Sequence, residues 1–291
     1  MSDYLCKCNN TTVKKNGKIL LDDFALEVQP KRIIALIGDV ESTSEFLRML
    51  ARRDISEGGR VEYDTQFKEE ILAAPWKIQY VPDDIVCYRN LSAGDFLTGI
   101  TMNYGEVSEE RARLLEYFDI DPKEQLLNMT FEKNRAVAVT ASLLAKPTLL
   151  LLDHPFDMVS STMYKKIITE MVKTYFAGGT VILTADKYED IDVLCSDYVF
   201  IRKGKIQKRY YGRKNLPMAH KIVTIWGCEG MPGELKLKPL CNRGDCIRFI
   251  YEGEDAGALA SHLNRTVCRK FTVEEMSVED VIYQDYKRWM L

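Results

Sequence analysis

Strand-like and helix-like hydrophobic patterns alternate along residues 18–202. The apolar runs at 33–37 and 148–152 have the length of strands, and continuous runs of this kind are typical of parallel strands that are covered on both faces. Helices are predicted where apolar residues recur every three or four positions, as in 42–53 and 161–176. Further strands are expected at 18–28, 60–64, 77–81, 180–184 and 198–202, and further helices within 92–118 and at 132–145. This order predicts an α/β domain with a mainly parallel sheet.

Polar and glycine residues mark where several of these helices begin or end. Ser42 or Thr43 is expected to cap the helix at 42–53, and Ser92 is expected to cap the first helix of the 92–118 region. Ser108 opens a capping box, which predicts the start of a second helix there. The pair Gly178–Gly179 should stop the helix at 161–176.

The pattern changes after the turn at 203–205. Strands are predicted at 221–227 and 245–253, and helices at 254–264 and 277–288. This mixture predicts a small α+β domain, and we place the boundary near residue 212, which gives domains 1–211 and 212–291.

Composition narrows the class of protein. The 291 residues are 46% hydrophobic and 29% charged, which is ordinary for a globular chain that buries a core. The net charge of −3 argues against nucleic acid as a partner, because nucleic-acid binding needs a clustered basic surface. No apolar stretch approaches the ~20 residues of a membrane span, and no signal-peptide layout is visible, so a cytoplasmic protein is expected. The eight cysteines form no CxxC pair and are interpreted as reduced, mostly buried thiols, not as a metal site.

Several segments resemble the ATP-binding cassette (ABC) ATPases in order and spacing. The run PTLLLLDHP at 147–155 is similar to that family's Walker B strand, and 136–161 follows its signature helix and Walker B framework. Its opening strands and phosphate loop, its Q-loop region and its switch region are similar to 20–38, 77–97 and 180–206. The resemblance implies a P-loop-type cassette domain over 1–211, with a helical subdomain at about 84–145, followed by the small α+β C-terminal domain. Residues 276–286 resemble the C-terminal domain of cassette subunits that serve separate permeases in bacterial exporters.

The phosphate loop departs from the family pattern. A working loop, G-x-x-x-x-G-K-[ST], cradles phosphates with backbone N–H groups, while its Lys reaches the β- and γ-phosphates and its Ser or Thr holds Mg²⁺. Here GDVESTSEF (38–46) keeps Gly38 but is one residue shorter and lacks the later glycine and the lysine. Three acidic residues are expected to repel a polyphosphate: Asp39, Glu41 and Glu45. The hydroxyls that remain to meet an anion, or to serve as plain helix caps, are Ser42, Thr43 and Ser44.

The other catalytic positions of the family also carry different residues. Lys15 stands where an aromatic ring would stack on adenine, and Asp83 stands at the Q-loop glutamine. Ser160 and Asp186 replace the D-loop aspartate and the switch histidine. The signature Leu-Ser-Gly-Gly-Gln reads Met-Thr-Phe-Glu-Lys, so that Thr130 keeps a hydroxyl while Phe131 and Glu132 replace the glycines.

Two residues of the Walker B segment leave alternatives open. Asp153 is retained and is either a Mg²⁺ ligand or a strand-end residue that caps nearby backbone. His154 replaces the catalytic glutamate and is either a general base or a packed histidine.

These losses predict a catalytically degenerate ABC subunit, a pseudo-ATPase that acts as a structural or regulatory cytoplasmic subunit of a membrane exporter, peripheral to the cytoplasmic membrane. No catalytic residue and no metal site is expected, and ATP and Mg²⁺ are expected as cofactors only if residual binding persists. The expected partners are a membrane permease subunit, an active ABC ATPase subunit or both, in a homodimer or heterodimer. The alternatives are a divergent but active ABC ATPase that hydrolyses ATP with a partner cassette, and a soluble binding module that reuses the pocket.

Overall fold

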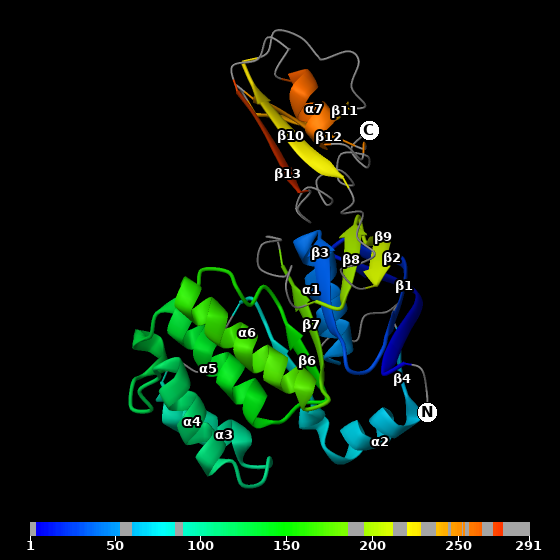
Figure 1. Cartoon of the computed structure of the whole chain (residues 1–291). Helices are drawn as coiled ribbons and strands as arrows, with labels where there is room; N and C mark the ends of the chain where they lie inside the picture. Colours follow the sequence, from blue (N-terminus) through cyan, green and yellow to red (C-terminus); the bar gives the residue numbers. More distant parts are fainter. Residues whose placement is uncertain are drawn as a thin grey trace. The chain divides into compact units, whose positions relative to one another are not determined.

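The structure, a computed structural model, describes residues 4–52, 60–84, 90–185, 195–211, 220–227, 237–243, 246–251, 253, 256–263 and 270–275. The chain forms two compact units, unit 1 (Met1–Tyr211) and unit 2 (Gly212–Leu291). Figure 1 shows the elements of each unit.

Unit 1 is built on two sheets. The larger sheet has the order β5-β6-β7-β3-β8-β9, in which β5 to β8 pair in parallel and β9 is antiparallel. Its strands are β3 (Ile33–Gly38), β5 (Ile78–Val81), β6 (Leu149–Leu152), β7 (Thr180–Thr184), β8 (Asp197–Arg202) and β9 (Lys205–Tyr211). The smaller sheet is antiparallel in the order β2-β1-β4, with β1 (Cys6–Lys15), β2 (Lys18–Val28) and β4 (Val61–Tyr63). The α/β fold with a mainly parallel sheet, predicted from the sequence, is confirmed.

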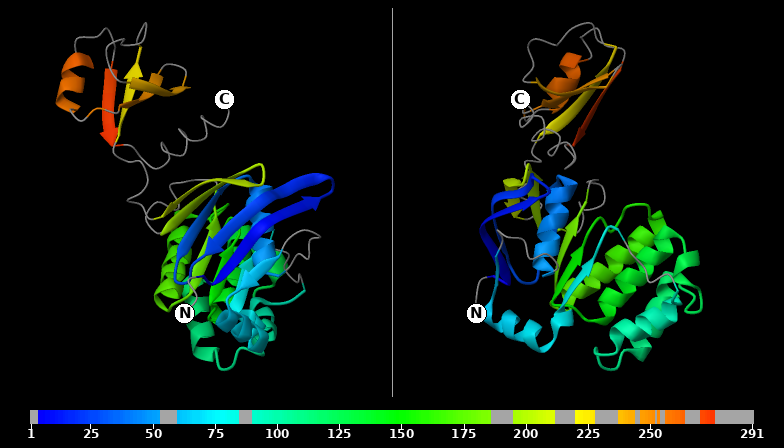
Figure 2. Two further views of the ribbon diagram at one scale, coloured as in Figure 1. Left: turned by 90° about the vertical axis from the view of Figure 1, so that its right-hand side faces the viewer. Right: turned by 180° about the vertical axis from the view of Figure 1, so that it is seen from behind.

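Helices lie on both faces of the larger sheet. They are α1 (Val40–Leu50), α2 (Thr65–Ala73), α3 (Ala93–Thr101), α4 (Ser108–Phe118), α5 (Phe131–Leu144) and α6 (Ser161–Phe176), with short 3-10 turns η1 (Pro75–Lys77) and η2 (Leu126–Asn128). Helix α1 contacts β3, β7 and β8 on one side and β2 of the smaller sheet on the other. On the other face, α5 and α6 pack together against β5 and β7, and α3 and α4 pack on α5 (Figure 2).

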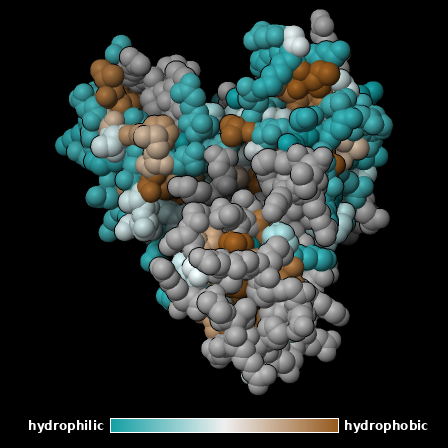
Figure 3. All heavy atoms as spheres, turned by 90° about the horizontal axis from the view of Figure 1, so that it is seen from above, coloured by the Kyte–Doolittle hydropathy of each residue, from teal (hydrophilic) through white to brown (hydrophobic). Residues whose placement is uncertain are grey.

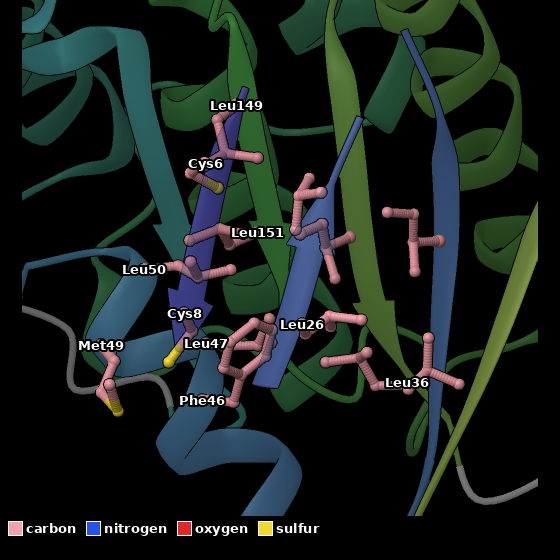
Figure 4. Close-up of a cluster of buried hydrophobic side chains, with 14 of the residues drawn as sticks. Cys6, Cys8, Leu26, Leu36, Phe46, Leu47, Met49, Leu50, Leu149 and Leu151 are labelled. Carbon is pink, nitrogen blue, oxygen red and sulfur yellow. The ribbon is translucent and has the colours of Figure 1, made fainter. Parts of the chain in front are cut away.

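The main core of unit 1 fills the space between the two sheets (Figure 4). Cys6, Cys8 and Leu26 from the smaller sheet meet Phe46 of α1 and Leu151 of the larger sheet, and all five are buried. Burial raises the pKa of the Cys6 thiol well above its ordinary value, with a smaller contribution from Cys8. The thiol therefore stays protonated and packs as an apolar group.

Helix ends differ in part from the sequence prediction. Ser92 accepts a hydrogen bond from the Asp95 N–H and caps α3, as predicted. Helix α1 begins earlier than expected, at Val40, so the predicted capping by Ser42 or Thr43 is wrong. The predicted capping box at Ser108 is also wrong, because this residue is already the first of α4 and its N–H bonds to Glu106 Oε1 at 2.7 Å.

Two strands and a helix of unit 1 were not expected from the sequence, β1, β9 and α2. Strands β1 and β2 form a hairpin through Asn16 and Gly17, whose φ angles are 51° and 78°. An Asn-Gly turn with two positive φ angles is the strongest short-range signal for a hairpin. That dipeptide is therefore the feature of the sequence that predicts β1.

Unit 2 contains one antiparallel sheet and a helix. The sheet order is β11-β12-β10-β13. Its elements are β10 (Lys221–Trp226), β11 (Leu237–Arg243), β12 (Cys246–Tyr251), α7 (Ala256–Leu263) and β13 (Lys270–Glu275). Val223, Phe249 and Leu259 are among the buried residues that form its core. The predicted helix at 277–288 and the segment 276–286 lie outside the described residues.

Some large apolar side chains of the described residues are exposed. Among the residues that are coloured in Figure 3, hydrophilic ones predominate and hydrophobic ones form small patches. The most exposed large apolar residues in the described ranges include Met102, Met158 and Phe176. None of the helices in these ranges has both the length and the apolar character needed to span a membrane.

Helix α4 is tied to α6 by an ion-pair network. Arg113 donates hydrogen bonds to both carboxylate oxygens of Glu170, at 3.1 and 2.9 Å, and Lys173 donates to Glu170 at 2.6 Å. The Glu170 side chain is 4% exposed. Burial acts to raise the pKa of Glu170, but the hydrogen bonds from Arg113 and Lys173 outweigh it and hold the pKa below its ordinary value of 4.5.

We expect Phe46→Ala to lower the free energy of unfolding by about 3–5 kcal/mol, because it leaves a cavity between the two sheets. The measurement is urea denaturation at neutral pH. Phe176→Ala is the matched control, since its side chain is 80% exposed. Equal losses in the two variants would contradict the assignment of Phe46 to the core.

We expect Glu170→Gln to lower the free energy of unfolding by about 1–3 kcal/mol at neutral pH, because it weakens hydrogen bonds to two charged groups. Since the folded-state pKa is lowered, the stabilisation by Glu170 is complete above its ordinary pKa and is lost as the pH falls through the lower, folded value. The stability of the variant should therefore fall less steeply with acidification. Urea denaturation over a series of acidic pH values measures both effects, with the exposed Glu116→Gln as control.

Candidate functional site

The residues predicted for the nucleotide site gather at the carboxyl edge of the parallel strands. Gly38 ends β3, Asp153 follows β6, and Asp83 lies just beyond β5. Ser44 comes from α1, which follows β3 directly. In open α/β sheets this edge is where ligands bind.

Between β3 and α1, at this edge, there is no loop that could cradle phosphate. Only Asp39 separates β3 from α1. The N–H groups of Ser42 and Thr43 both bond to the Asp39 carbonyl at 3.0 Å, inside the first turn of the helix. Thr43 Oγ1 also donates to the carbonyls of Asp39 and Val40. Because these two backbone N–H groups are used in this way, they are not available to cradle a polyphosphate.

Gly38 has a local structural role. Its φ is +139°, and a Cβ at this position would lie 1.7 Å from the carbonyl oxygen of Ile201 on β8. The next residue, Asp39, donates its N–H to the same carbonyl at 3.2 Å. The close approach of β3 and β8 therefore requires a glycine here.

Asp153 is enclosed by hydroxyl groups. Its side chain is 1% exposed. Ser44 Oγ and Thr184 Oγ1 donate to Oδ1 at 2.8 and 2.9 Å, and Tyr80 OH donates to Oδ2 at 2.9 Å. Burial, and then the adjacent Asp153 carboxylate, raise the pKa of Tyr80, so the phenol stays protonated as a donor. Of the two alternatives for Asp153, the structure is nearer to the one in which the carboxylate satisfies neighbouring donors. These donors are side-chain hydroxyl groups, not backbone N–H groups.

These contacts do not fit a Mg²⁺ nucleotide. Asp153 and Ser44, which would hold the ion, are hydrogen-bonded to each other. Thr184 and Tyr80 donate two further hydrogen bonds to the Asp153 carboxylate. In the described part of the chain, no cluster of three or more His, Cys, Asp or Glu is arranged to hold a metal ion.

Two of the three acidic residues of the 38–45 segment have basic partners, and the third, Asp39, accepts a hydrogen bond from the Lys203 N–H. Glu45 has a side chain that is 1% exposed, and its Oε2 lies 3.4 Å from Arg48 Nη1 and 3.8 Å from Lys15 Nζ. Glu41 pairs with Lys18 of the β1–β2 hairpin. The expectation that these carboxylates repel a polyphosphate therefore needs correction, since basic partners offset Glu41 and Glu45.

Asp83, at the predicted Q-loop position, is held by a buried arginine. Arg135 of α5 is fully buried and donates to Asp83 Oδ1 at 3.1 Å and to the Asp83 carbonyl at 3.2 Å. The same guanidinium donates to the Asp153 carbonyl at 3.1 Å. Arg135 therefore joins α5 to the ends of β5 and β6.

His154 is packed inside the unit. Its side chain is 2% exposed, and its backbone N–H donates to Thr184 Oγ1 at 2.7 Å. The ring nitrogens lie 3.9 Å from Asp153 Oδ1 and 3.8 Å from Asp157 Oδ2. This burial favours the packed histidine over the general base.

The signature residues make contacts within the chain. Thr130 caps α5 by accepting from the Lys133 N–H at 3.3 Å, and the Phe131 ring lies 4.9 Å from the Arg135 guanidinium. Glu132 Oε1 accepts hydrogen bonds from the N–H and the hydroxyl of Ser160, the N-cap of α6. The glutamate at a glycine position of the family is thus bonded to the D-loop position of its own chain.

The site contains residues that sequence analysis missed, and one predicted residue is not seen. Tyr80, Thr184 and Arg135 were not singled out, although each lies next to a motif position. The signal that could have found Tyr80 and Thr184 is their place near the carboxyl ends of the strands that flank β6. Asp186, at the predicted switch position, lies outside the described residues.

We expect Tyr80→Phe to cost about 1 kcal/mol and Asp153→Asn about 1–3 kcal/mol of unfolding free energy without any nucleotide, because each breaks buried hydrogen bonds. Urea denaturation of both single variants and of the double variant measures the coupling between them, which should be at least about 0.5 kcal/mol. Asp84→Asn, at an exposed aspartate, should change little. Strict additivity of the two site variants would contradict the hydroxyl cage.

Comparison with known proteins gives one consistent result. No protein-family model matches the chain. It is 22% identical over 282 residues to the uncharacterized ABC transporter ATP-binding protein YhaQ of Bacillus subtilis, covering 91% of this chain and 92% of that one. It is 27% identical over 219 residues to the uncharacterized ABC transporter ATP-binding protein MJ1023 of Methanocaldococcus jannaschii, covering 71% and 77%.

Solved structures agree with these relatives. An ATP binding subunit of an ABC transporter superposes with a TM-score of 0.62 at 17% identity, over 71% of this chain and 90% of that one. A dimeric post-hydrolysis state of the ATP-binding cassette MJ0796, bound to ADP and Pi, gives a TM-score of 0.61 at 17% identity, over 71% and 98%. The chain therefore has the fold of the ATP-binding cassette, and it is similar in sequence to ATP-binding subunits of ABC transporters.

Proposed function

We propose that this chain is a non-hydrolysing ABC subunit, a pseudo-ATPase with a structural or regulatory role in a membrane exporter. One observation carries the proposal. Helix α1 begins at Val40, directly after Gly38 and Asp39, so that helix stands where the family has its phosphate loop. Without that loop and its lysine, the segment between β3 and α1 lacks the groups with which the family binds the β- and γ-phosphates.

The second half of a nucleotide site is altered as well. In a cassette dimer, the signature of one chain faces the nucleotide bound to the other. Here Phe131 and Glu132 occupy the glycine positions, and Glu132 is bonded to Ser160 of its own chain. An active cassette paired with this chain would meet a bulky ring and a carboxylate in place of two glycines, and we expect its hydrolysis to be impaired.

The proposed partner is a permease subunit or an active cassette, bound through the helical region around 83–118. Leu91, Ile100 and Met102 are exposed there, and Leu127 beside Leu91 is 58% exposed. Apolar side chains that remain exposed near one another favour a protein contact. We place the protein at the cytoplasmic face of the membrane because it is similar to ATP-binding subunits of ABC transporters.

The similarity to YhaQ supports a role that involves both units. That match covers 91% of this chain, so it extends beyond unit 1 into unit 2. A small C-terminal domain after the cassette is what the resemblance of 276–286 implies for exporter subunits with a separate permease.

We expect millimolar Mg-ATP to leave the melting temperature of the purified chain unchanged. A ligand at a hundredfold excess over its Kd would stabilise the folded state by about 2.7 kcal/mol, which thermal unfolding detects readily. Calorimetric titration is the second readout, and Mg²⁺ alone is the control. Saturable binding that Asp153→Asn removes would overturn the proposal.

A divergent but active ATPase is the second candidate. It is favoured by the 2.8 Å contact between Ser44 and Asp153, which keeps together the two positions that hold Mg²⁺ in the family. This candidate predicts ATP hydrolysis by the chain co-purified with a partner cassette, and a loss of that activity on Asp153→Asn. Unchanged activity in the variant complex would reject it.

A further inference from the structure

A cavity of about 440 Å³ lies at the opposite edge of the parallel sheet from the residues described above. Its walls include Pro147 and Thr148, just before β6, and Gly178 and Gly179, just before β7. The carboxyl ends of the same strands hold Asp153 and Thr184. The cavity is therefore separate from the vestigial nucleotide site, and its size is within the range of about 300–1,000 Å³ that is usual for small-molecule sites.

Basic side chains from four different segments converge on this cavity. They are Lys77, Arg113, Lys146 and Lys173, and the acidic residues that line it are Glu110 and Glu170. Arg113 pairs with both carboxylates, and Lys173 pairs with Glu170. Two positive charges remain without a carboxylate in the lining.

These two charges belong to Lys77 and Lys146. The Lys77 ammonium group donates to the uncharged carbonyl of Lys146 at 3.0 Å. Lys146 has an exposed side chain, and among the described residues no hydrogen bond or ion pair of its ammonium group is found. Lysines placed in this way can bind an added anion without first breaking an ion pair.

The helix end after α5 engages one of these lysines, since its Lys146 carbonyl accepts from Lys77, whereas the Lys146 ammonium group has no such contact with the described residues. The N–H groups of Gly178 and Gly179 bond to the carbonyls of Tyr175 and Thr174 at the end of α6. At the end of α5, the Lys146 N–H bonds to the Leu143 carbonyl at 2.9 Å. These three carbonyls are thus already hydrogen-bonded to backbone N–H groups, and the Lys146 carbonyl is the one that accepts from Lys77.

The remaining wall is mostly apolar, apart from Thr148 and Thr174. Leu143, Pro147 and Ala177 line the cavity together with the two glycines. A phosphomonoester carries about −1.5 to −2 charges at neutral pH, which matches the two lysines, and its organic group would contact the apolar wall. A bare inorganic ion would leave most of a cavity of about 440 Å³ unfilled.

We propose that this cavity is a binding site for a small phosphomonoester, held by Lys77 and Lys146. The site is independent of the proposed pseudo-ATPase role, because it shares no residue with the edge where the nucleotide would lie. It gives the subunit a way to sense a small anionic molecule at a surface away from the cassette motifs.

The test is calorimetric titration of the full-length chain with phenyl phosphate at low ionic strength. We expect saturable one-to-one binding in the wild type and a loss of about tenfold or more in affinity in the double variant Lys77→Gln/Lys146→Asn. Asparagine is chosen at 146 because that residue has a φ of 45°, which asparagine tolerates. The matched control is Lys68→Gln/Lys123→Gln, which removes the same charge at two exposed lysines elsewhere and should bind like the wild type.

Three outcomes would overturn the proposal. The first is that the wild type shows no saturable binding at millimolar phenyl phosphate, and the second is that both double variants bind with equal affinity. The third is that Lys77→Gln/Lys146→Asn lowers the stability of the fold but leaves the affinity unchanged, which would make the lysines structural supports of the helix ends. If the double variant fails to fold, the titration is repeated with the single variant Lys146→Asn, which changes an exposed side chain and should also bind phenyl phosphate more weakly than the wild type.

The same variants separate this site from the nucleotide edge. If Mg-ATP stabilises the wild type but not the Lys77→Gln/Lys146→Asn variant, the nucleotide binds in this cavity and the pseudo-ATPase proposal stands. If Mg-ATP stabilises both equally, the nucleotide binds elsewhere, and a failed pseudo-ATPase proposal leaves the phenyl phosphate result unaffected.

Discussion

A buried carboxylate, Asp153, is the constraint on which unit 1 depends. A charge in the interior is costly unless hydrogen bonds replace its hydration. The donors here come from three different elements, Ser44 in α1, Tyr80 in β5 and Thr184 in β7. Satisfying Asp153 therefore fixes α1 against the carboxyl ends of the central strands, and Arg135 attaches α5 to the same place.

The contacts that stabilise this edge also occupy the groups on which nucleotide chemistry depends. The serine hydroxyl and the aspartate are bonded to each other, the Ser42 and Thr43 N–H groups are bonded to the Asp39 carbonyl, and Glu132 is bonded to Ser160. Phosphate binding is consequently disfavoured for a different reason from the one that the sequence suggests. Charge repulsion, which the sequence suggests, is offset by Lys15, Lys18 and Arg48, whereas the geometry of a strand joined to a helix through one residue leaves no loop.

The sequence predicts the parallel sheet and its helices well, because long apolar runs and helical periodicity report burial directly. It misplaces the start of α1, since Ser42 and Thr43 look like caps, whereas the structure turns their segment inward and buries them. Tyr80 and Thr184 could not be found from local pattern, because their importance arises only when β5, β6 and β7 lie side by side. The cavity near Lys146 is beyond sequence analysis for the same reason, since its lysines come from distant segments.

Gly38 has a consequence for how the ancestry of such chains is judged. The contact with the Ile201 carbonyl excludes any side chain at this position whether or not a nucleotide is bound. Selection for packing alone would thus keep the first glycine of the motif while the rest of the loop drifts. A glycine at the end of β3 therefore records the strand arrangement, and its presence in a chain of this fold is not by itself a sign of nucleotide binding or of its loss.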